Sequence, residues 1–336
     1  MRILYLAAGY HPVALHTPPH QHVLVTTLLA IAPLFALLAV GVFARRRNIL
    51  SHADAASLNR FVMDISLPAL IIATLATQSF SAAYLLLPVA MWIAQAVAMG
   101  AVWLASRALR LKRHSTGAAL LSVYGNTGYM GYPMTTALFP ALLPATVVID
   151  QFGMTIMLYL LTPFISGRYG EGAGVQSVRQ SLMAVARSPL LISVGIGLLA
   201  HALLAPRPDA AHDAAIKIVL DTLALVGGAT VPVVMVSVGL RLSTGPVRRS
   251  LSAISALGAV KLVLLPVVCY LSARFLLGLR GDLLSVSVLE AAMPPSVTST
   301  IFAAQGRMDS DLSVAVLFVL TLASAVAIPV LLSVLR

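Results

Sequence analysis

The most regular feature of the chain is the alternation of long apolar runs with short polar stretches. A helix needs about 20 apolar residues to cross the hydrocarbon core of a bilayer, and runs of about that length recur from end to end. The pattern predicts an all-α membrane protein with ten transmembrane helices, at about 22–43, 58–78, 84–106, 117–139, 144–165, 188–205, 220–240, 251–275, 283–304 and 312–335.

Composition supports a membrane protein over a soluble one. Hydrophobic residues make up 59% of the 336 residues and charged residues only 10%, with a mean hydropathy of +0.95. A soluble domain has about 25% charged residues. The formal net charge is +11, but the basic residues form small clusters in loops rather than one stripe, so no nucleic-acid partner is expected. The single Cys269 excludes a disulfide framework and a cysteine-based metal site.

Basic residues are distributed unevenly between the two sides that ten spans would create. Of the 22 Lys and Arg residues, 15 fall on the side reached after the first span and 6 on the opposite side, while Lys261 lies inside a span. Because loops rich in Lys and Arg stay in the cytoplasm, both termini are predicted to be extracytoplasmic. We therefore expect a multi-pass protein of the bacterial inner membrane.

The segments between the spans divide the chain into four parts. Residues 1–21 form an extracytoplasmic extension whose histidines are interleaved with prolines, which favours a flexible tail over a metal site. Residues 22–165 hold five spans, residues 166–187 form a polar cytoplasmic linker, and residues 188–336 hold the other five. No metal or cofactor is expected.

The two sets of five spans share features at a nearly constant offset. Pro68 and Pro232 are 164 residues apart, and Ser122-Val123 and Ser287-Val288 are 165 apart. Since five is odd, a repeated five-span unit inserts upside down. Inverted repeats with broken helices at matching positions are typical of transporters whose substrate site lies at the midplane.

The fourth and ninth spans are the predicted broken helices. Three glycines and Pro133 fall within residues 125–133, and Pro294 and Pro295 interrupt the ninth span. Irregular backbone at membrane depth is tolerated only where it is buried in protein or lines a cavity. We expect the two breaks to cross, so that the N-termini of the second half-helices present free N–H groups to an anion.

Polar side chains accompany both breaks, and three charged residues lie within spans. Asn126, Thr127 and Ser296 are candidates to complete the hydrogen bonds of an anion. Lys261 either pairs with Glu290 or offsets the negative C-terminal ends of the first half-helices, and Glu290 or Asp64 is a candidate carrier of a coupled proton. For Asp64, a carboxylate wetted near the cytoplasmic face is the favoured interpretation. Asp150, near a predicted external end, is interpreted as a helix-terminus residue.

These motifs together resemble the auxin efflux carrier family, which includes bacterial malate and malonate permeases. The likeness covers nearly all of residues 22–335. It is carried by Leu58-Asn-Arg-Phe-Val62 with Leu67-Pro68, Asn126-Thr-Gly128 with Gly131-Tyr-Pro133, Ala229-Thr-Val-Pro232 with Gly239, Gly278-Leu-Arg-Gly-Asp-Leu283 and Ala291-Ala-Met-Pro-Pro295.

The resemblance implies a ten-helix fold similar to sodium/bile-acid symporters, with a mobile crossover domain against a scaffold. It implies carrier transport of organic anions, commonly linked to protons or driven by the membrane potential. Asn126, with Thr127 and Gly128, would form the substrate site of the first crossover, Pro294-Pro295 the second, and Gln151 a polar support. The family often has Asn-Pro where this chain has Ser188-Pro189, which leaves the contribution of Ser188 open.

The predicted function is therefore secondary active transport of small organic anions such as malate, malonate or auxin-like carboxylates. A channel or receptor is the alternative. An intramembrane enzyme is not expected, because the chain lacks His-Glu-x-x-His, P-loop and Gly-x-Ser-x-Gly motifs, and Asp64 with Glu290 is the only candidate acid pair. The expected partners are the anion and the lipid bilayer, and both proton coupling and a homodimer remain open.

Overall fold

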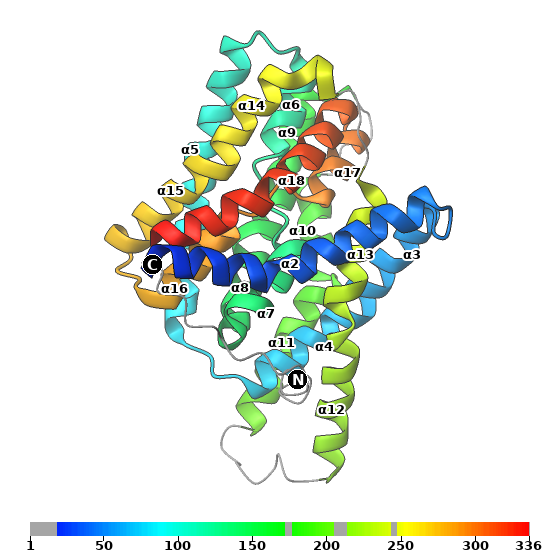
Figure 1. Ribbon diagram of the computed structural model, residues 1–336, viewed down its shortest axis with the longest axis vertical. Helices are drawn as coiled ribbons and strands as arrows, with labels where there is room; N and C mark the ends of the chain where they lie inside the picture. Colours follow the sequence, from blue (N-terminus) through cyan, green and yellow to red (C-terminus); the bar gives the residue numbers. More distant parts are fainter. Residues whose placement is uncertain (1–18, 172–176, 205–213, 243–246, 336) are drawn as a thin grey trace.

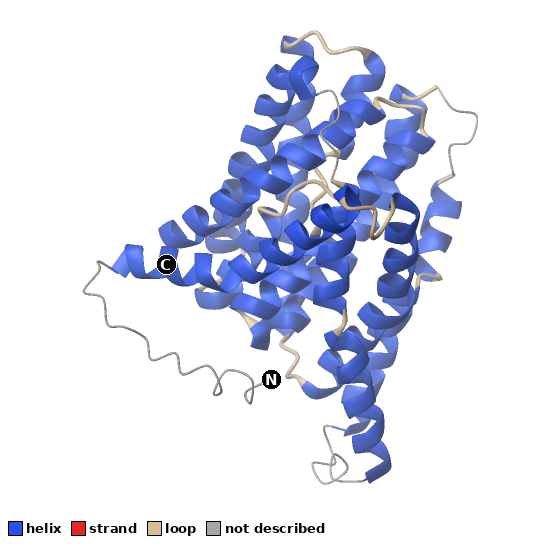
Figure 2. Cartoon of the chain, turned by 45° about the vertical axis from the view of Figure 1, so that its right-hand side comes forward, coloured by secondary structure: helices blue, strands red, loops and turns tan. Residues whose placement is uncertain are grey.

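The computed structural model describes residues 19–171, 177–204, 214–242 and 247–335, and these residues form helices joined by short loops (Figures 1 and 2). The predicted extension before residue 19 lies outside them.

Several helices contain 3-10 or π-helical segments, labelled η. The elements of residues 19–171 are α2 (Pro19–Arg46), α3 (His52–Phe61), η1 (Val62–Ser66), α4 (Leu67–Thr77), η2 (Ala82–Leu86), α5 (Leu87–Ala108), α6 (Arg113–Leu121), η3 (Thr127–Gly131), α7 (Tyr132–Leu138), η4 (Pro140–Leu142), α8 (Leu143–Val148), η5 (Ile149–Thr155) and α9 (Ile156–Tyr169). Those of the remaining residues are α10 (Val178–Ala186), α11 (Pro189–Leu204), α12 (Ala214–Gly228), α13 (Thr230–Arg241), η7 (Val247–Ser250), α14 (Leu251–Ala259), η8 (Val260–Leu264), α15 (Leu265–Leu271), η9 (Ser272–Leu276), α16 (Gly281–Ala291), α17 (Val297–Gln305) and α18 (Ser310–Leu335).

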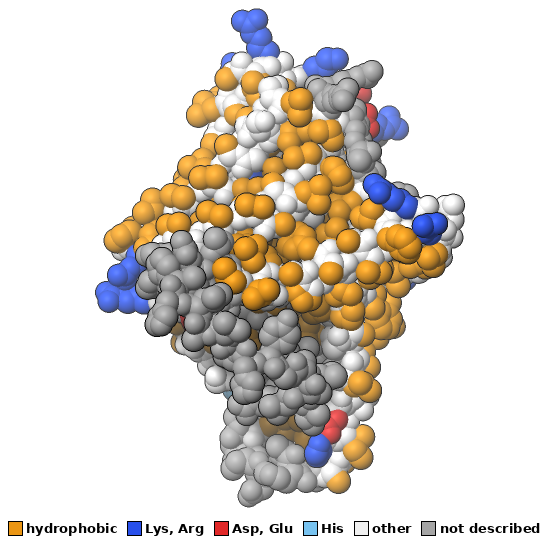
Figure 3. Space-filling view, in the orientation of Figure 1, with side chains coloured by type: hydrophobic (Ala, Val, Ile, Leu, Met, Phe, Trp, Pro, Cys, Tyr) orange, Lys and Arg blue, Asp and Glu red, His pale blue; other side chains and the backbone are white. Residues whose placement is uncertain are grey.

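The fold is an all-helical membrane-protein fold, as predicted. Among the described residues, seven helices are long and apolar enough to cross a membrane, and α10 with α11, bent by 46°, makes an eighth when taken as one span. The other two predicted spans are the broken helices α6/η3/α7 and α16/α17. Each predicted span thus coincides with helical structure, while the count of ten membrane crossings stays a prediction. Hydrophobic side chains are spread along the whole visible face, and most of the basic side chains lie near its edges (Figure 3).

The helices pack in two groups. In the first group, α11 and α12 pack on α4, and α13 packs on α2 and α3. In the second group, α5 packs on α15 and η5, α6 packs on α9 and α17, and α15 packs on α16. Helix α18 lies beside α2 (Figure 1) and also contacts α14, α6 and α17, so it joins the two groups.

Close helix contact within the first group depends on two glycines. At Gly41 in α2 and Gly239 in α13, an added Cβ would overlap the backbone of the other helix. The two helices therefore pack backbone against backbone, which is a common way for helices to associate in membranes. This contact explains why a glycine stands at position 239, one of the positions that carry the family resemblance.

The segment predicted as a polar linker is partly helical. Helix α9 continues to Tyr169, and α10 begins after a capping box in which Ser177 accepts from the Gln180 N–H and Gln180 accepts from the Ser177 N–H. Apolar residues on one face of α10, including buried Val185, let this short helix pack against α9. The division of the chain into two five-helix repeats stays a prediction.

Candidate functional site

The two broken helices meet at their breaks. The Asn126 N–H donates to the Pro294 carbonyl (2.7 Å), and the Ser296 N–H donates to the Tyr124 carbonyl (2.8 Å). The two segments thus form a single antiparallel bridge between Gly125 and Pro295. Each break therefore supplies one donor and one acceptor to the other, which pairs backbone groups that a broken helix cannot pair within itself. The predicted crossing of the fourth and ninth spans is confirmed.

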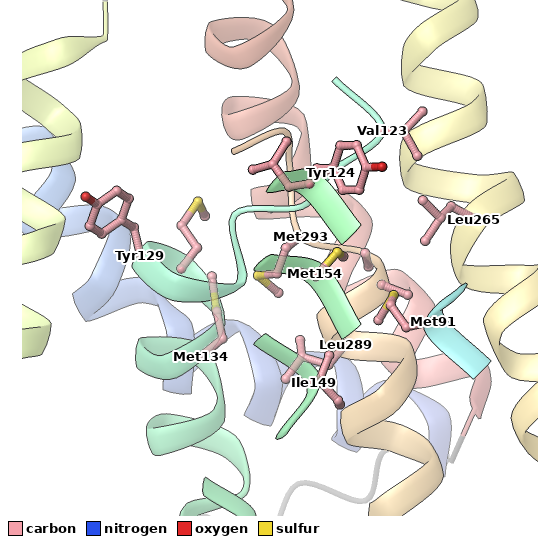
Figure 4. Packing of buried hydrophobic residues seen from close by; sticks show 14 of the residues in the cluster. Met91, Val123, Tyr124, Tyr129, Met134, Ile149, Met154, Leu265, Leu289 and Met293 are labelled. Atoms are coloured by element: carbon pink, nitrogen blue, oxygen red, sulfur yellow. The ribbon is translucent and has the colours of Figure 1, made fainter. Parts of the chain in front are cut away.

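A glycine at the centre of the first break allows the crossing. A Cβ on Gly125 would lie 3.0 Å from the Met154 methyl carbon, 3.3 Å from the Lys261 Nζ and 3.4 Å from the Met293 Cβ. The first two distances are shorter than ordinary van der Waals contact, so a side chain would push the Met154 methyl group and the Lys261 ammonium away. Met154 and Met293 lie close together among the buried hydrophobic side chains (Figure 4).

After each break, a helix begins with its N-terminus at the crossing. Segments η3 and α7 are continuous from Thr127, and α17 begins at Val297. The first N–H groups of a helix have no carbonyl partner within the helix and carry partial positive charge. Ser296 accepts from only one of them, the Ser299 N–H, at 2.9 Å. Two helix ends therefore direct positive potential toward the same place.

A cavity opens at this place. Its unfilled space is about 690 Å³, including the part that is open to solvent. Of the predicted site residues, Asn126, Thr127, Gly128, Gln151 and Ser296 line it. The other lining residues are Met63, Tyr124, Gly125, Tyr129, Asp150, Met154, Thr155, Leu158, Tyr159, Val185, Ser188, Leu190 and Thr298.

Both helix groups contribute to the cavity wall. Most of the wall belongs to the second group, but Met63 in η1 and Leu190 in α11 come from the first, and Val185 and Ser188 lie at the bend between α10 and α11. The Ser188 hydroxyl accepts from the Leu191 N–H (3.2 Å), so it also caps α11. Ser188, which stands where the family often has Asn, therefore still places a polar side chain at the cavity.

Asn126 and Gln151 each present a polar atom that has no hydrogen-bond partner within the described residues. For Asn126, which is 2% exposed, this atom is the amide nitrogen Nδ2. For Gln151 it is the carbonyl oxygen Oε1, whereas its Nε2 donates to Asp150 at 2.6 Å. A buried polar atom is normally hydrogen-bonded, so both side chains are equipped to contact a ligand.

Asp150 was wrongly interpreted as a helix-terminus residue. It is 4% exposed, lies in η5, ten residues after the start of the helix formed by residues 140–169, and lines the cavity. Its Oδ1 accepts from the Thr127 hydroxyl at 2.5 Å and its Oδ2 accepts from Gln151. The helix begins at Pro140, four residues before the predicted start at Pro144, so Asp150 lies inside the helix and not at its end.

Lys261 and Glu290 form no direct ion pair, so the first of the two predicted roles for Lys261 is wrong. The Lys261 ammonium instead donates to the carbonyl of Ala291 (2.9 Å), the last residue of α16. This contact is the predicted alternative, in which Lys261 offsets the negative C-terminal end of a first half-helix. Glu290 Oε1 accepts from the hydroxyls of Thr135 (3.0 Å) and Thr146 (3.2 Å).

The remaining predicted site residues lie outside the cavity wall. Pro294 and Pro295 support the site through the backbone bridge, and Glu290 is buried behind it against Gly131, where a Cβ would overlap its carboxylate. Asp64 is exposed on η1, next to the lining residue Met63. No cluster of three His, Cys, Asp or Glu side chains suitable for a metal ion occurs in the described part of the chain.

The sequence matches the family of membrane transport proteins over residues 26–181 and 174–332, which together cover most of the chain. This chain belongs to that family, the auxin efflux carrier family. It is similar to an uncharacterized transporter of Methanothermobacter thermautotrophicus, with 28% identity over 87% of this chain and 93% of the relative. An uncharacterized transporter of Methanocaldococcus jannaschii is 25% identical over the same shares. The protein is thus a multi-pass membrane transporter with archaeal relatives.

Proposed function

We propose that this transporter is a carrier for small organic anions, such as malate, malonate or auxin-like carboxylates. The observation that carries the proposal is the meeting of two helix N-termini with the Asn126 amide at one cavity. The Asn126 Nδ2 and the free N–H groups are all donors, and a carboxylate offers only acceptors. Helix N-termini are established binding positions for anions.

The location of the cavity supports alternating access over an open channel. Its wall combines a large contribution from the second helix group with Met63 and Leu190 from the first. Movement of one group relative to the other would change access to the cavity without unfolding the crossing, which is held by its own two hydrogen bonds. We include proton-linked transport in this proposal. We also place the protein in a bacterial-type inner membrane with both termini extracytoplasmic.

The predicted coupling residues keep distinct roles in this proposal. Glu290 and Asp64 stay candidates for proton carriers, Lys261 stabilises the end of α16, and Gln151 positions Asp150 while its Oε1 is available to the substrate. The two five-helix repeats and a homodimer also remain proposals.

A counterflow assay in liposomes tests the function. Liposomes containing the purified protein are loaded with unlabelled malate, malonate or indole-acetate, and uptake of the same labelled acid is measured. A carrier should show uptake stimulated by the internal acid, because exchange requires the loaded site to reorient. Empty liposomes serve as the control. Uptake at the same rate with and without internal acid would indicate a channel. No uptake of any of the acids would contradict the proposed substrate class.

A further inference from the structure

The cavity wall formed by the described residues contains one carboxyl side chain and no basic side chain. Among the residues that line the cavity, Asp150 is the only Asp or Glu, and there is no Lys, Arg or His. The two hydrogen bonds from Thr127 and Gln151 fix the carboxyl group at the wall. A substrate carboxylate that enters the cavity would meet this group inside the protein, where charges are poorly screened by solvent.

No cation in the described residues neutralises Asp150. The only salt bridge found there joins Lys217 to Asp221, far away in α12. Three titratable groups on neighbouring elements interact electrostatically with Asp150, and none of them is basic. They are Tyr129 in η3, Tyr132 in α7 and Glu290 in α16.

Two basic groups lie near this region, and neither forms a salt bridge with Asp150. Lys261, on η8, donates its hydrogen bond to the Ala291 carbonyl, and its electrostatic interactions are with Cys269 and Glu290. Arg241, at the end of α13, acts on Tyr129 and not on Asp150. Positive potential near the cavity thus comes from the helix ends, Lys261 and Arg241, while Asp150 is the one carboxyl group at the wall and forms no salt bridge with any described residue.

We propose that Asp150 takes up a proton when the substrate anion binds, so that proton and anion occupy the cavity together. The proposal rests on the proposed function and specifies how transport is coupled. The carboxylate gains a proton from the solution on the open side of the cavity and becomes a neutral acid. Its O–H then donates to a substrate oxygen, and the proton leaves when the anion leaves on the other side.

Glu290 does not fit this role as well. It is fully buried, it is absent from the cavity wall, and its Oε1 is held by two threonine hydroxyls. A charge change at Glu290 would reach the substrate only through the crossing, whereas Asp150 is at the surface that the substrate touches. Asp64 is exposed and also absent from the wall. The three acids can therefore be distinguished by substitution.

The test measures how exchange of labelled malate, malonate and indole-acetate depends on pH, over a range in which each free acid is fully ionised. In wild-type liposomes the half-saturating concentration should rise with pH, approaching about tenfold per pH unit when one proton binds with the anion. Asp150→Asn should remove this dependence, and Asp150→Glu should retain it. Glu290→Gln tests the rival carrier and should also retain it, and Thr162→Ala, which lies outside the cavity wall, is the control.

Three results would overturn the proposal: a wild-type protein without pH dependence, a pH dependence that survives in Asp150→Asn, or one that disappears in Glu290→Gln. If the wild type exchanges none of the acids, the proposed function itself fails. If it exchanges an acid but gives one of the three results above, only the role of Asp150 fails. Proton uptake provides a measurement that needs no variant. Adding the exchanged acid, already neutralised, to purified wild type in weakly buffered detergent should consume about one proton per occupied site, and no uptake would contradict the proposal.

Discussion

At the scale of single residues, the amide of Asn126 is the side chain whose contribution to substrate binding is most directly testable. Asn126→Ala removes a hydrogen bond to a charged group, which contributes about 1.5–3 kcal/mol. We expect about tenfold to hundredfold weaker substrate affinity. Anion preference over neutral analogues should persist, because the helix ends remain. Affinity and charge selectivity are measured in matched liposomes, once an exchanged acid is known.

Thr162→Ala is a suitable control for this measurement. The Thr162 hydroxyl donates to the Leu158 carbonyl within α9, and Thr162 does not line the cavity. Its loss should leave affinity unchanged. An Asn126→Ala protein with wild-type affinity would place the substrate elsewhere and remove the main support for the proposed function.

A second residue-scale prediction concerns the buried acceptor on α16. Glu290→Gln keeps an oxygen for the hydroxyls of Thr135 and Thr146, whereas Glu290→Leu leaves both hydroxyls without that acceptor. An unsatisfied buried polar group costs about 1–3 kcal/mol. We therefore expect Glu290→Leu to melt at a lower temperature than Glu290→Gln in detergent. The two hydroxyls also lie 2.8 Å from each other, within hydrogen-bond distance. Equal melting temperatures would show that this hydrogen bond alone satisfies them.

The site was only partly predictable at this scale. Asn126, Thr127 and Ser296 were found because they adjoin breaks that glycine and proline make visible in the sequence. Asp150 was missed because its depth and direction depend on where its helix begins and on the π-helical turn of η5, and neither leaves a periodic signal. The hydrogen bond from Lys261 to Ala291 involves a backbone carbonyl, which residue identities do not reveal.

At the scale of elements, the contact between α2 and α13 gives a prediction about folding. Gly239→Ala places a methyl group against the backbone of Leu38 and Gly41, where no flexible side chain can move away. Overpacking of this kind costs about 1–3 kcal/mol. We expect a lower melting temperature and a lower yield of monodisperse protein. Gly100→Ala in α5 is the matched control, since a Cβ there meets nothing within 4 Å, and equal effects would contradict the close helix contact.

Helix positions were predicted better than helix details. Each of the ten apolar runs coincides with observed helix, because the hydrocarbon thickness sets a length that the sequence displays. The crossing of the two breaks also followed from physical reasoning, since broken backbone at that depth needs a partner. Helix α10 was not predicted, because its capping box and short amphipathic face lie within a segment dominated by polar residues.

At the scale of the whole molecule, the arrangement of basic residues agrees between sequence and structure. Arg45 at the end of α2 donates to the Leu240 carbonyl near the end of α13 (3.0 Å), and Arg113 at the start of α6 donates to the Arg168 carbonyl near the end of α9 (2.6 Å). All four positions belong to helix ends that were predicted to face the cytoplasm. The helix ends that carry most of the basic residues thus associate in pairs in the folded protein.

The prediction at this scale is that this basic side faces the cytoplasm and that both termini lie outside. The start of α2 and the end of α18 lie close together (Figure 1), so one measurement reports on both. A reporter that is active only in the cytoplasm, fused after the last residue, should be inactive. The same reporter inserted after Arg110, in the basic loop between α5 and α6, should be active. The bias of 15 basic residues against 6 is what sets the predicted orientation. An active C-terminal reporter with an inactive Arg110 reporter would reverse the orientation, whereas activity at both positions would contradict the even number of spans.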